Sequence, residues 1–234
     1  MSRRDALAAN LAAVHARIDD ACAAAGRDPG AVQLVVVTKH FPASDVELLA
    51  GLGVTHVGEN RHQEAMAKAA QVTAPVTWHF IGSLQSNKAA AVASYADVVE
   101  SVDRAKLVAP LGRGRLARGL PEPLDCLVQV SLDPPSAGPG RAGADPDRVL
   151  ELAALIAEAD GLNVAGVMAV APLDEDPRAA FARLAVVAER LRSEHPEARV
   201  LSAGMSGDLE AAIAHGATHV RVGRAVLGER ELNG

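Results

Sequence analysis

Aromatic residues are scarce in this chain of 234 residues, where Phe, Trp and Tyr together make up 2% of the sequence. Because 49% of the residues are hydrophobic, a core can still form, but it must be built from Ala, Val, Leu and Ile. Long apolar runs are missing too. No segment approaches the roughly 18 consecutive apolar residues of a membrane helix, and none follows Arg3 and Arg4 as a signal peptide would require. We therefore expect a soluble cytoplasmic protein that does not contact membranes.

Cysteine and positive charge are also in short supply. The two cysteines, Cys22 and Cys126, are too far apart for a disulfide framework or a metal-ligand spacing, which favours a reducing compartment and no metal site. The formal net charge is −6, whereas a general nucleic-acid-binding surface needs a basic face. We therefore expect no nucleic-acid partner.

What the chain does contain is a repeated unit of a short apolar run, a polar loop and an amphipathic stretch. Apolar residues at helical spacing predict a first helix over residues 2–25, with Ser2 as its N-cap and Gly26 as its stop. Strands are then expected at residues 34–38, 56–58, 77–81, 98–101, 124–130, 164–170, 199–202 and 219–222. Further helices are expected at residues 44–52, 60–70, 86–93, 103–116, 146–159, 177–194 and 206–215.

Strands and helices that alternate in this way imply a parallel sheet. We predict an α/β fold, a closed (β/α)8 TIM barrel over residues 33–230, with residues 1–26 as an extra N-terminal helix and 1–234 as one domain. An open doubly wound sheet is the alternative, but the usual Gly-rich dinucleotide loop is absent after the first strand. Two long loops are expected at 110–123 and 131–146, the second at the mouth as a lid. Arg113, Arg115 and Arg118 are interpreted as a solvated face.

Lys39 comes directly after the first expected strand. In barrels of this class the loops after the strands build the active site, so Lys39 should lie at the mouth. Its position alone is compatible with a solvated loop charge and with an amine placed for chemistry. Glu59 ends the second strand and either orients Lys39 or Asn60 or caps the next helix, where Asn60 and Gln63 have capping-box spacing.

Two turns after the seventh and eighth expected strands are suited to a phosphate. Gly204 permits close backbone approach, Ser206 is a suitable helix N-cap, and Gly223 exposes backbone N–H groups. Free N–H groups and the helix dipole favour an anion, and barrels often bind phosphate at these two loops. Ordinary glycine turns with a helix cap would look the same.

Two further residues are expected inside the barrel. Arg221 alternates with Val220 and Val222, so it points inward if those valines pack under the helices. A buried guanidinium then needs an anionic or hydrogen-bonding partner. His79, within the third strand, is interpreted as a satisfied interior histidine rather than a ligand.

A lysine and a phosphate site at one mouth suggest a phosphorylated carbonyl compound held as an imine. A sugar phosphate, as in Schiff-base aldolases, and pyridoxal phosphate fit this arrangement equally well.

Five blocks occur along the chain in this order: Val36-Val-Thr-Lys39, Gly58-Glu-Asn60, Trp78-His-Phe-Ile-Gly-Ser-Leu-Gln-Ser-Asn-Lys88, Gly204-Met-Ser206 and Val220-Arg-Val-Gly223. Together they closely resemble the pyridoxal phosphate homeostasis protein family, whose members are single-domain relatives of the barrel domain of alanine racemase. The likeness covers nearly the whole chain, and the third block is its most specific part.

The resemblance implies a barrel that holds pyridoxal 5′-phosphate as an aldimine on Lys39. The cofactor-binding residues that it implies are Lys39, Asn60, Met168, Ser202, Ser206, Arg221, Gly223 and Arg224. The two serines, Gly223 and Arg224 would surround the phosphate. Arg221 would serve either the phosphate or the ring nitrogen. The implied role is intracellular homeostasis of the cofactor by buffering or supply. We expect a monomer whose partners are the cofactor and, transiently, pyridoxal-phosphate-dependent enzymes.

Two positions depart from many relatives. Arg224 stands where many relatives have a small hydroxyl residue, so a side-chain hydroxyl contact to phosphate is lost there. Arg141 stands where many relatives have a lysine; arginine keeps the charge but cannot form an imine.

Catalysis at the imine would need a second proton-transfer group. Racemisation requires donors on both faces of the cofactor, and Lys39 would serve only one. The chain's only tyrosine, Tyr95, precedes the fourth expected strand, at the end of the barrel opposite the mouth. We therefore expect a binding protein rather than an enzyme. A pyridoxal-phosphate-dependent racemase or lyase, or a Schiff-base aldolase, is the alternative.

Overall fold

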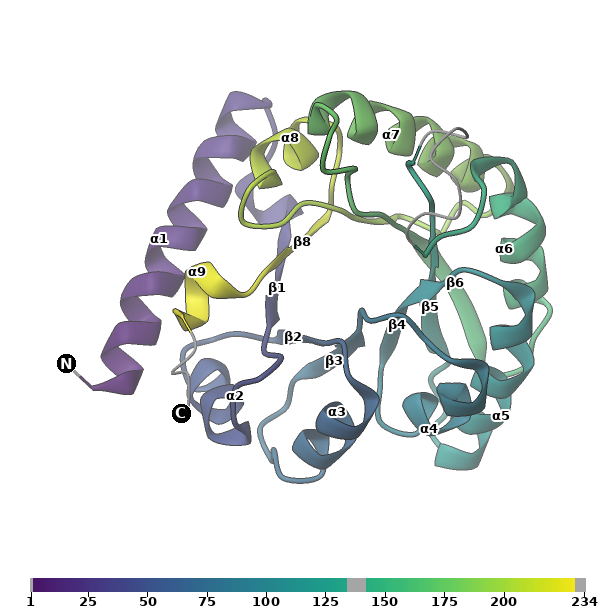
Figure 1. The fold of residues 1–234 in the computed structure, drawn as a ribbon, viewed down its shortest axis with the longest axis horizontal. Coiled ribbons are helices and arrows are strands. Elements are labelled where there is room, and N and C mark those ends of the chain that lie inside the picture. The colour runs from purple at the N-terminus through teal and green to yellow at the C-terminus, as the bar shows by residue number, and fades with distance from the viewer. Residues whose placement is uncertain (1, 134–141, 230–234) are drawn as a thin grey trace.

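Eight parallel strands close into a barrel in the computed structural model, which describes residues 2–133 and 142–229 (Figure 1). Each strand pairs with its neighbours in sequence, and β8 pairs with β1 to close the ring. The strands are β1 (Gln33–Val37), β2 (His56–Glu59), β3 (Thr77–Phe80), β4 (Val98–Val102), β5 (Leu124–Gln129), β6 (Leu162–Met168), β7 (Val200–Ser202) and β8 (His219–Val222). The predicted (β/α)8 barrel is confirmed.

Both faces of the strands are buried, because helices cover one face and the opposite strands cover the other. In β1, Leu34 and Val36 join an apolar cluster with residues of the N-terminal helix. Val220 and Val222 of β8 belong to the same cluster. Arg221, which lies between these two valines, therefore points into the barrel, as the alternation predicts.

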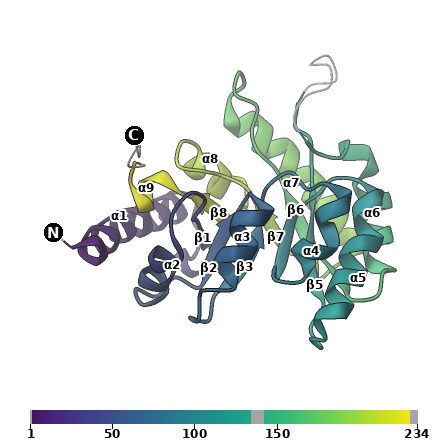
Figure 2. The same ribbon diagram turned by 60° about the horizontal axis from the view of Figure 1, so that its bottom comes forward.

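Helices form the outer layer of the barrel, and α1 runs along its outside next to α8 and α9 (Figures 1 and 2). The α-helices of the described residues are α1 (Arg3–Ala24), α2 (Ala43–Ala50), α3 (His62–Ala69), α4 (Ala89–Ala93), α5 (Val108–Arg118), α6 (Val149–Ala157), α7 (Pro177–Glu194), α8 (Leu209–Ala214) and α9 (Arg224–Leu227). Short 3₁₀ helices lie at Pro29–Ala31, Ser86–Lys88, Ala105–Leu107 and Pro146–Arg148. Over residues 2–133 and 142–229, none of these helices combines the length and apolarity needed to cross a membrane.

The first helix is the predicted one. Ser2 caps it by accepting a hydrogen bond from the Asp5 N–H at 3.1 Å, while the Asp5 carboxylate accepts one from the Ser2 N–H at 3.0 Å. Gly26 follows its end with a φ of 65°. The buried face of α1 includes Leu7 and Leu11 and covers β1 and β8, the two strands that close the barrel.

The prediction of a long loop over residues 110–123 is wrong. Pro110 lies in the first turn of α5, where a proline costs no internal hydrogen bond, and the helix continues to Arg118. The prediction of a solvated arginine face fails for two of the three residues. Arg115 is buried and donates to the Glu122 carbonyl at 2.8 Å, and Arg118 pairs with Asp97 at 3.0 Å. Only Arg113 is exposed as expected.

Two predicted helix caps are also wrong. Helix α3 begins at His62 and Arg61 precedes it, so Asn60 is not the N-cap and the capping box does not form. Helix α8 begins at Leu209, three residues beyond Ser206, so Ser206 belongs to a turn and not to a helix N-terminus. Part of the expected lid at 131–146 and Arg141 within it lie outside the described residues.

Candidate functional site

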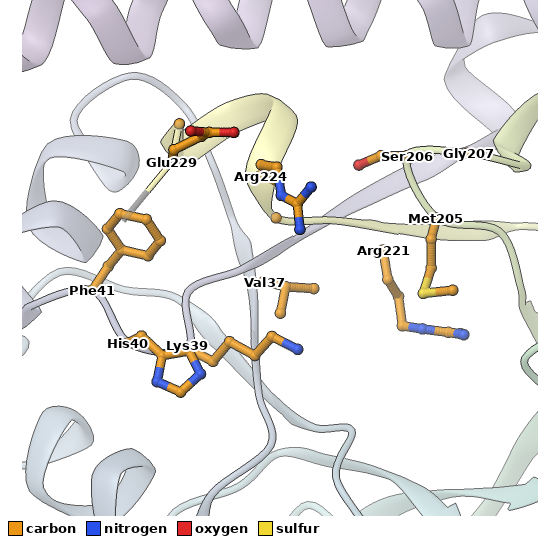
Figure 3. Close-up of a pocket in the computed structure, with 12 residues that line it drawn as sticks. Val37, Lys39, His40, Phe41, Met205, Ser206, Gly207, Arg221, Arg224 and Glu229 are labelled. Carbon is orange, nitrogen blue, oxygen red and sulfur yellow. The ribbon is translucent and has the colours of Figure 1, made fainter. Parts of the chain in front are cut away.

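A cavity of about 610 Å³ opens at the carboxyl ends of β1 and β8 (Figure 3). Its walls come from the turn after β1, the turn between β7 and α8, and the segment from β8 through α9. Five of the eight predicted cofactor residues line it, namely Lys39, Ser206, Arg221, Gly223 and Arg224. A volume in this range accommodates a small cofactor or substrate.

Lys39 reaches into this cavity from the turn that follows β1 (Figure 3). Within residues 2–133 and 142–229, its Nζ has no hydrogen-bond or ion-pair partner. Phe41 and Met205 add apolar wall on either side of the cavity, and the guanidinium of Arg3 lies 5.5 Å from the centre of the Phe41 ring. The site thus presents an accessible primary amine within a partly apolar cleft.

Arg221 presents its guanidinium to the cavity from inside the barrel, where it is almost fully buried. It donates to Ser202 Oγ at 2.6 Å and to the Ala169 carbonyl at 2.8 Å, and it lies 3.5 Å from Glu100 Oε2. The sequence predicted that Arg221 needs an anionic or hydrogen-bonding partner but did not identify Glu100. The available signal was a single carboxylate in strand β4, whose other residues are three valines and one serine.

Glu100 is the centre of a polar network inside the barrel. Its carboxylate accepts from Ser202 Oγ at 2.6 Å and contacts His79 Nδ1 at 2.7 Å. Burial alone would raise its pKa, but His79, Arg221 and Ser202 together hold it well below the ordinary value. His79 also contacts His56 at 2.8 Å, so the interpretation of His79 as a satisfied interior histidine is confirmed.

Two more histidines lie at the amino-terminal ends of the strands. The rings of His56 and His219 are 6.1 Å apart, and each lies near His79. Burial, followed by repulsion from the neighbouring imidazoles, lowers the pKa of His56 to about 4. Burial and His79 lower the pKa of His219 to about 4 as well. Despite this cluster, the described part of the chain holds no group of side chains arranged to bind a metal ion.

Unused backbone donors gather at the rim of the cavity. Among the described residues, none accepts a hydrogen bond from the backbone N–H groups of Ser206, Gly207, Gly223 or Arg224. All four residues line the cavity. Gly204 makes the turn between β7 and α8 possible, because its φ is +92° and an added Cβ would lie 2.7 Å from the Ala212 Cβ. This arrangement is suited to an anion.

Three predicted cofactor residues do not line this cavity. The hydroxyl of Ser202 is engaged by Glu100 and Arg221, so it is not available to a phosphate. Met168 is buried against Val98 and Leu127 in the barrel interior. Asn60 is half-buried, and its Oδ1 is enclosed without a hydrogen-bond partner.

Tyr95 lies away from the cavity. Its ring stacks on His62 of α3, and its hydroxyl lies 3.5 Å from His62 Nδ1. It packs in the cluster between the strands and the outer helices, on the outside of the barrel wall. Burial, together with the charge of Glu59, raises the pKa of Tyr95.

Comparison with known proteins gives a consistent match along the chain. Residues 4–231 match the family model of the alanine racemase N-terminal domain. The chain is 42% identical over 247 residues to the pyridoxal phosphate homeostasis protein of Mycobacterium tuberculosis, with 98% of this chain and 95% of that one covered. It is 38% identical to the protein of the same name from Escherichia coli, and the match covers 97% of this chain and 98% of that one.

A solved structure is similar over the same length. PipY of Synechococcus elongatus, determined with pyridoxal phosphate bound, is 33% identical, with a TM-score of 0.80. The match covers 95% of this chain and 100% of PipY.

Proposed function

Because this chain belongs to the pyridoxal phosphate homeostasis protein family, we propose that it binds pyridoxal 5′-phosphate in the cavity that Lys39 enters. We further propose that it buffers or supplies this cofactor and makes transient contacts with enzymes that depend on it. The observation that carries the proposal is one accessible amine in the same cavity as four unused backbone N–H donors.

The residues of the cavity fit this cofactor. When bound, pyridoxal phosphate supplies an aldehyde that condenses with a primary amine and releases one water. Lys39 is the amine on the cavity wall. The N–H groups of Ser206, Gly207, Gly223 and Arg224 would hold the phosphate.

Arg221 has a different role in this proposal. Its charge is already matched by Glu100 in the barrel interior, so it is less suited to a phosphate dianion than the free donors at the rim. We propose that Arg221 faces the pyridine ring, where a guanidinium disfavours protonation of the ring nitrogen. That arrangement suits storage better than catalysis.

Further support for a binding role comes from the acid–base groups. Tyr95 is outside the barrel wall and its pKa is raised, so it is poorly placed to exchange protons at the cavity. His40, on the cavity wall next to Lys39, is the residue that would favour the alternative of a racemase or lyase. A test for that alternative is multiple-turnover exchange of the α-proton of an amino acid, lost in both Lys39→Ala and His40→Ala. If the wild-type protein shows no such exchange, the result supports the binding role.

The binding role has a direct test. Incubation with pyridoxal phosphate should turn the protein yellow, borohydride should shift the absorption band, and peptide mass spectrometry should then find the adduct on Lys39. Lys39→Ala should abolish the adduct, whereas Lys106→Ala, which removes an exposed lysine elsewhere, should not. A colourless wild-type protein without an adduct would contradict the proposal.

A further inference from the structure

Lys39 occupies a tight turn whose geometry is unusual for its residues. The N–H of Phe41 donates to the Thr38 carbonyl at 3.1 Å, which closes a four-residue turn with Lys39 and His40 in the middle. His40 has a φ of 69°, the left-handed region that glycine and asparagine normally occupy at this place in a type II turn. A histidine held there by nothing else would favour another conformation. The structure must therefore stabilise this turn by other contacts.

Helix α3 supplies these contacts on both sides of Lys39. Lys68 Nζ donates to the Thr38 carbonyl at 2.9 Å, just before Lys39 in the chain. Glu64 Oε1 accepts a hydrogen bond from the His40 N–H, just after Lys39. Because Glu64 and Lys68 lie one helical turn apart and pair at 3.2 Å, one face of α3 holds both peptide groups that flank Lys39.

The Lys68 ammonium is buried, with 4% of its side chain exposed, and all of its donors are used. An ammonium has three N–H groups, and the three acceptors are the Thr38 carbonyl, Glu59 Oε1 at 2.5 Å and Glu64 Oε1 at 3.2 Å. Glu59 Oε1 also accepts from the Thr38 hydroxyl at 2.6 Å. The network therefore reaches the turn through both the backbone and a side chain.

Stability alone does not account for these charges. Well-packed apolar residues of similar volume often stabilise a fold as much as a buried ion pair does. Here each charged group instead makes a directed contact to the turn or to a group that holds it. Burial opposes ionisation of Glu64, but the His40 N–H and Lys68 hold its pKa below the ordinary value, so it remains an acceptor for His40 at neutral pH.

We propose that Glu64 and Lys68 are positioning residues that hold the turn around Lys39 and so aim its amine into the cavity (Figure 3). This inference rests on the proposed function, because it assigns Glu64 and Lys68 to the attachment of the cofactor to Lys39. Covalent attachment depends steeply on where the amine lies, since a misplacement of about 1 Å costs roughly a hundredfold in rate.

Substitution of Glu64 tests the inference most cleanly, because its side chain is partly exposed, at 26%. Glu64→Leu removes the acceptor for the His40 N–H, whereas Glu64→Gln keeps an oxygen there. The attachment rate of added pyridoxal phosphate is measured by borohydride trapping and mass spectrometry of the Lys39 peptide. We expect Glu64→Leu to slow attachment by about tenfold or more and Glu64→Gln to remain within about threefold of wild type.

A second readout needs no cofactor. Amide hydrogen exchange of His40 in the cofactor-free protein should accelerate about tenfold or more in Glu64→Leu and little in Glu64→Gln. Glu47→Leu is the matched control, because Glu47 accepts the Thr73 and Ala74 N–H groups in a loop that precedes β3, at the amino-terminal end of the barrel. This control should change neither the attachment rate nor the exchange of His40.

The outcomes separate the two proposals. Absence of an adduct in wild type overturns the proposed function, and this inference with it. An adduct that forms equally fast in wild type and in a folded Glu64→Leu variant overturns the inference alone. If Glu64→Leu does not fold, Lys68→Met takes its place, since methionine has a similar length but removes the donor to the Thr38 carbonyl. Attachment at the wild-type rate in that variant would equally overturn the inference.

Discussion

Arg221 and Glu100 face each other inside the barrel, with Nη1 and Oε2 3.5 Å apart and Ser202 Oγ bonded to both side chains. Both residues are almost fully excluded from solvent. The guanidinium can therefore lie at the cavity as a fixed positive charge without lacking a counter-charge. This pair connects the buried histidines at one end of the barrel with the cavity at the other.

Removing one member of this pair should be costly. We expect Glu100→Gln to lower the free energy of unfolding by roughly 3 kcal/mol, because Arg221 would remain buried without a counter-charge. The loss is measured by urea denaturation of wild type, both single variants and the double variant Glu100→Gln with Arg221→Gln. The double variant should lose less than the sum of the two single losses. Strictly additive losses would show that the two charges do not interact.

Acid should destabilise the protein in a defined range of pH. His56 and His219 stay neutral in the fold down to a pKa of about 4, whereas in the unfolded chain they take up protons near pH 6.5. The unfolded state then binds more protons, so stability falls as the pH drops from about 7 to 4. We expect a combined loss on the order of 3 kcal/mol, because the two coupled histidines do not contribute independently.

Denaturation midpoints at several pH values check this expectation. His219→Gln should flatten the pH dependence, because one of the depressed titrations is gone. His15→Gln removes an exposed histidine of α1 and should leave the slope unchanged. A wild-type protein equally stable at pH 7 and pH 4 would contradict the proposed burial of neutral histidines.

Gly204 should tolerate no side chain. Its φ of +92° is unfavourable for other residues, and an added Cβ would lie 2.7 Å from the Ala212 Cβ. We expect Gly204→Ala to destabilise the protein by about 1–3 kcal/mol and to weaken binding of pyridoxal phosphate by displacing the turn at Ser206 and Gly207. Thermal unfolding and a spectroscopic titration measure the two effects. Gly207→Ala is the control for stability, because an added Cβ there meets no atom within 4 Å.

Features that depend on local pattern were predictable from the sequence. Apolar runs such as residues 34–37 identify the strands, and the alternation of Val220, Arg221 and Val222 correctly gives the inward direction of the arginine. The capping box at Ser2 also follows from a local motif. In each case the interacting residues are neighbours in sequence, so the pattern itself carries the information.

Features that depend on closure of the barrel were not predictable. Ser202 contacts Glu100, 102 residues earlier in the chain, and this contact withdraws its hydroxyl from the cavity. Lys68 belongs to an amphipathic helix, where a lysine normally suggests a solvated face, yet it is buried against the turn at Lys39. Arg115, predicted to be solvated, is likewise buried, and its Nη1 lies 3.5 Å from the carbonyl of Ala96, 19 residues earlier in the chain. Charge alone does not reveal which acceptors the fold will bring near.

Arg224 provides the last prediction, because it departs from the small hydroxyl residue of many relatives. Its side chain is exposed and lies beside the cavity (Figure 3), while its backbone N–H is one of the four unused donors. An exposed charge contributes about 0.2–1 kcal/mol to such an interaction, so Arg224→Ala should weaken binding of pyridoxal phosphate by no more than about fivefold. Arg224→Pro removes the N–H donor at the first position of α9 and should weaken binding more than Arg224→Ala does. A spectroscopic titration of both variants at low and high salt separates the two contributions, since only the contribution of the side-chain charge is strongly screened by salt. An equal loss in the two variants, well above fivefold, would show that the guanidinium, and not the backbone, holds the phosphate.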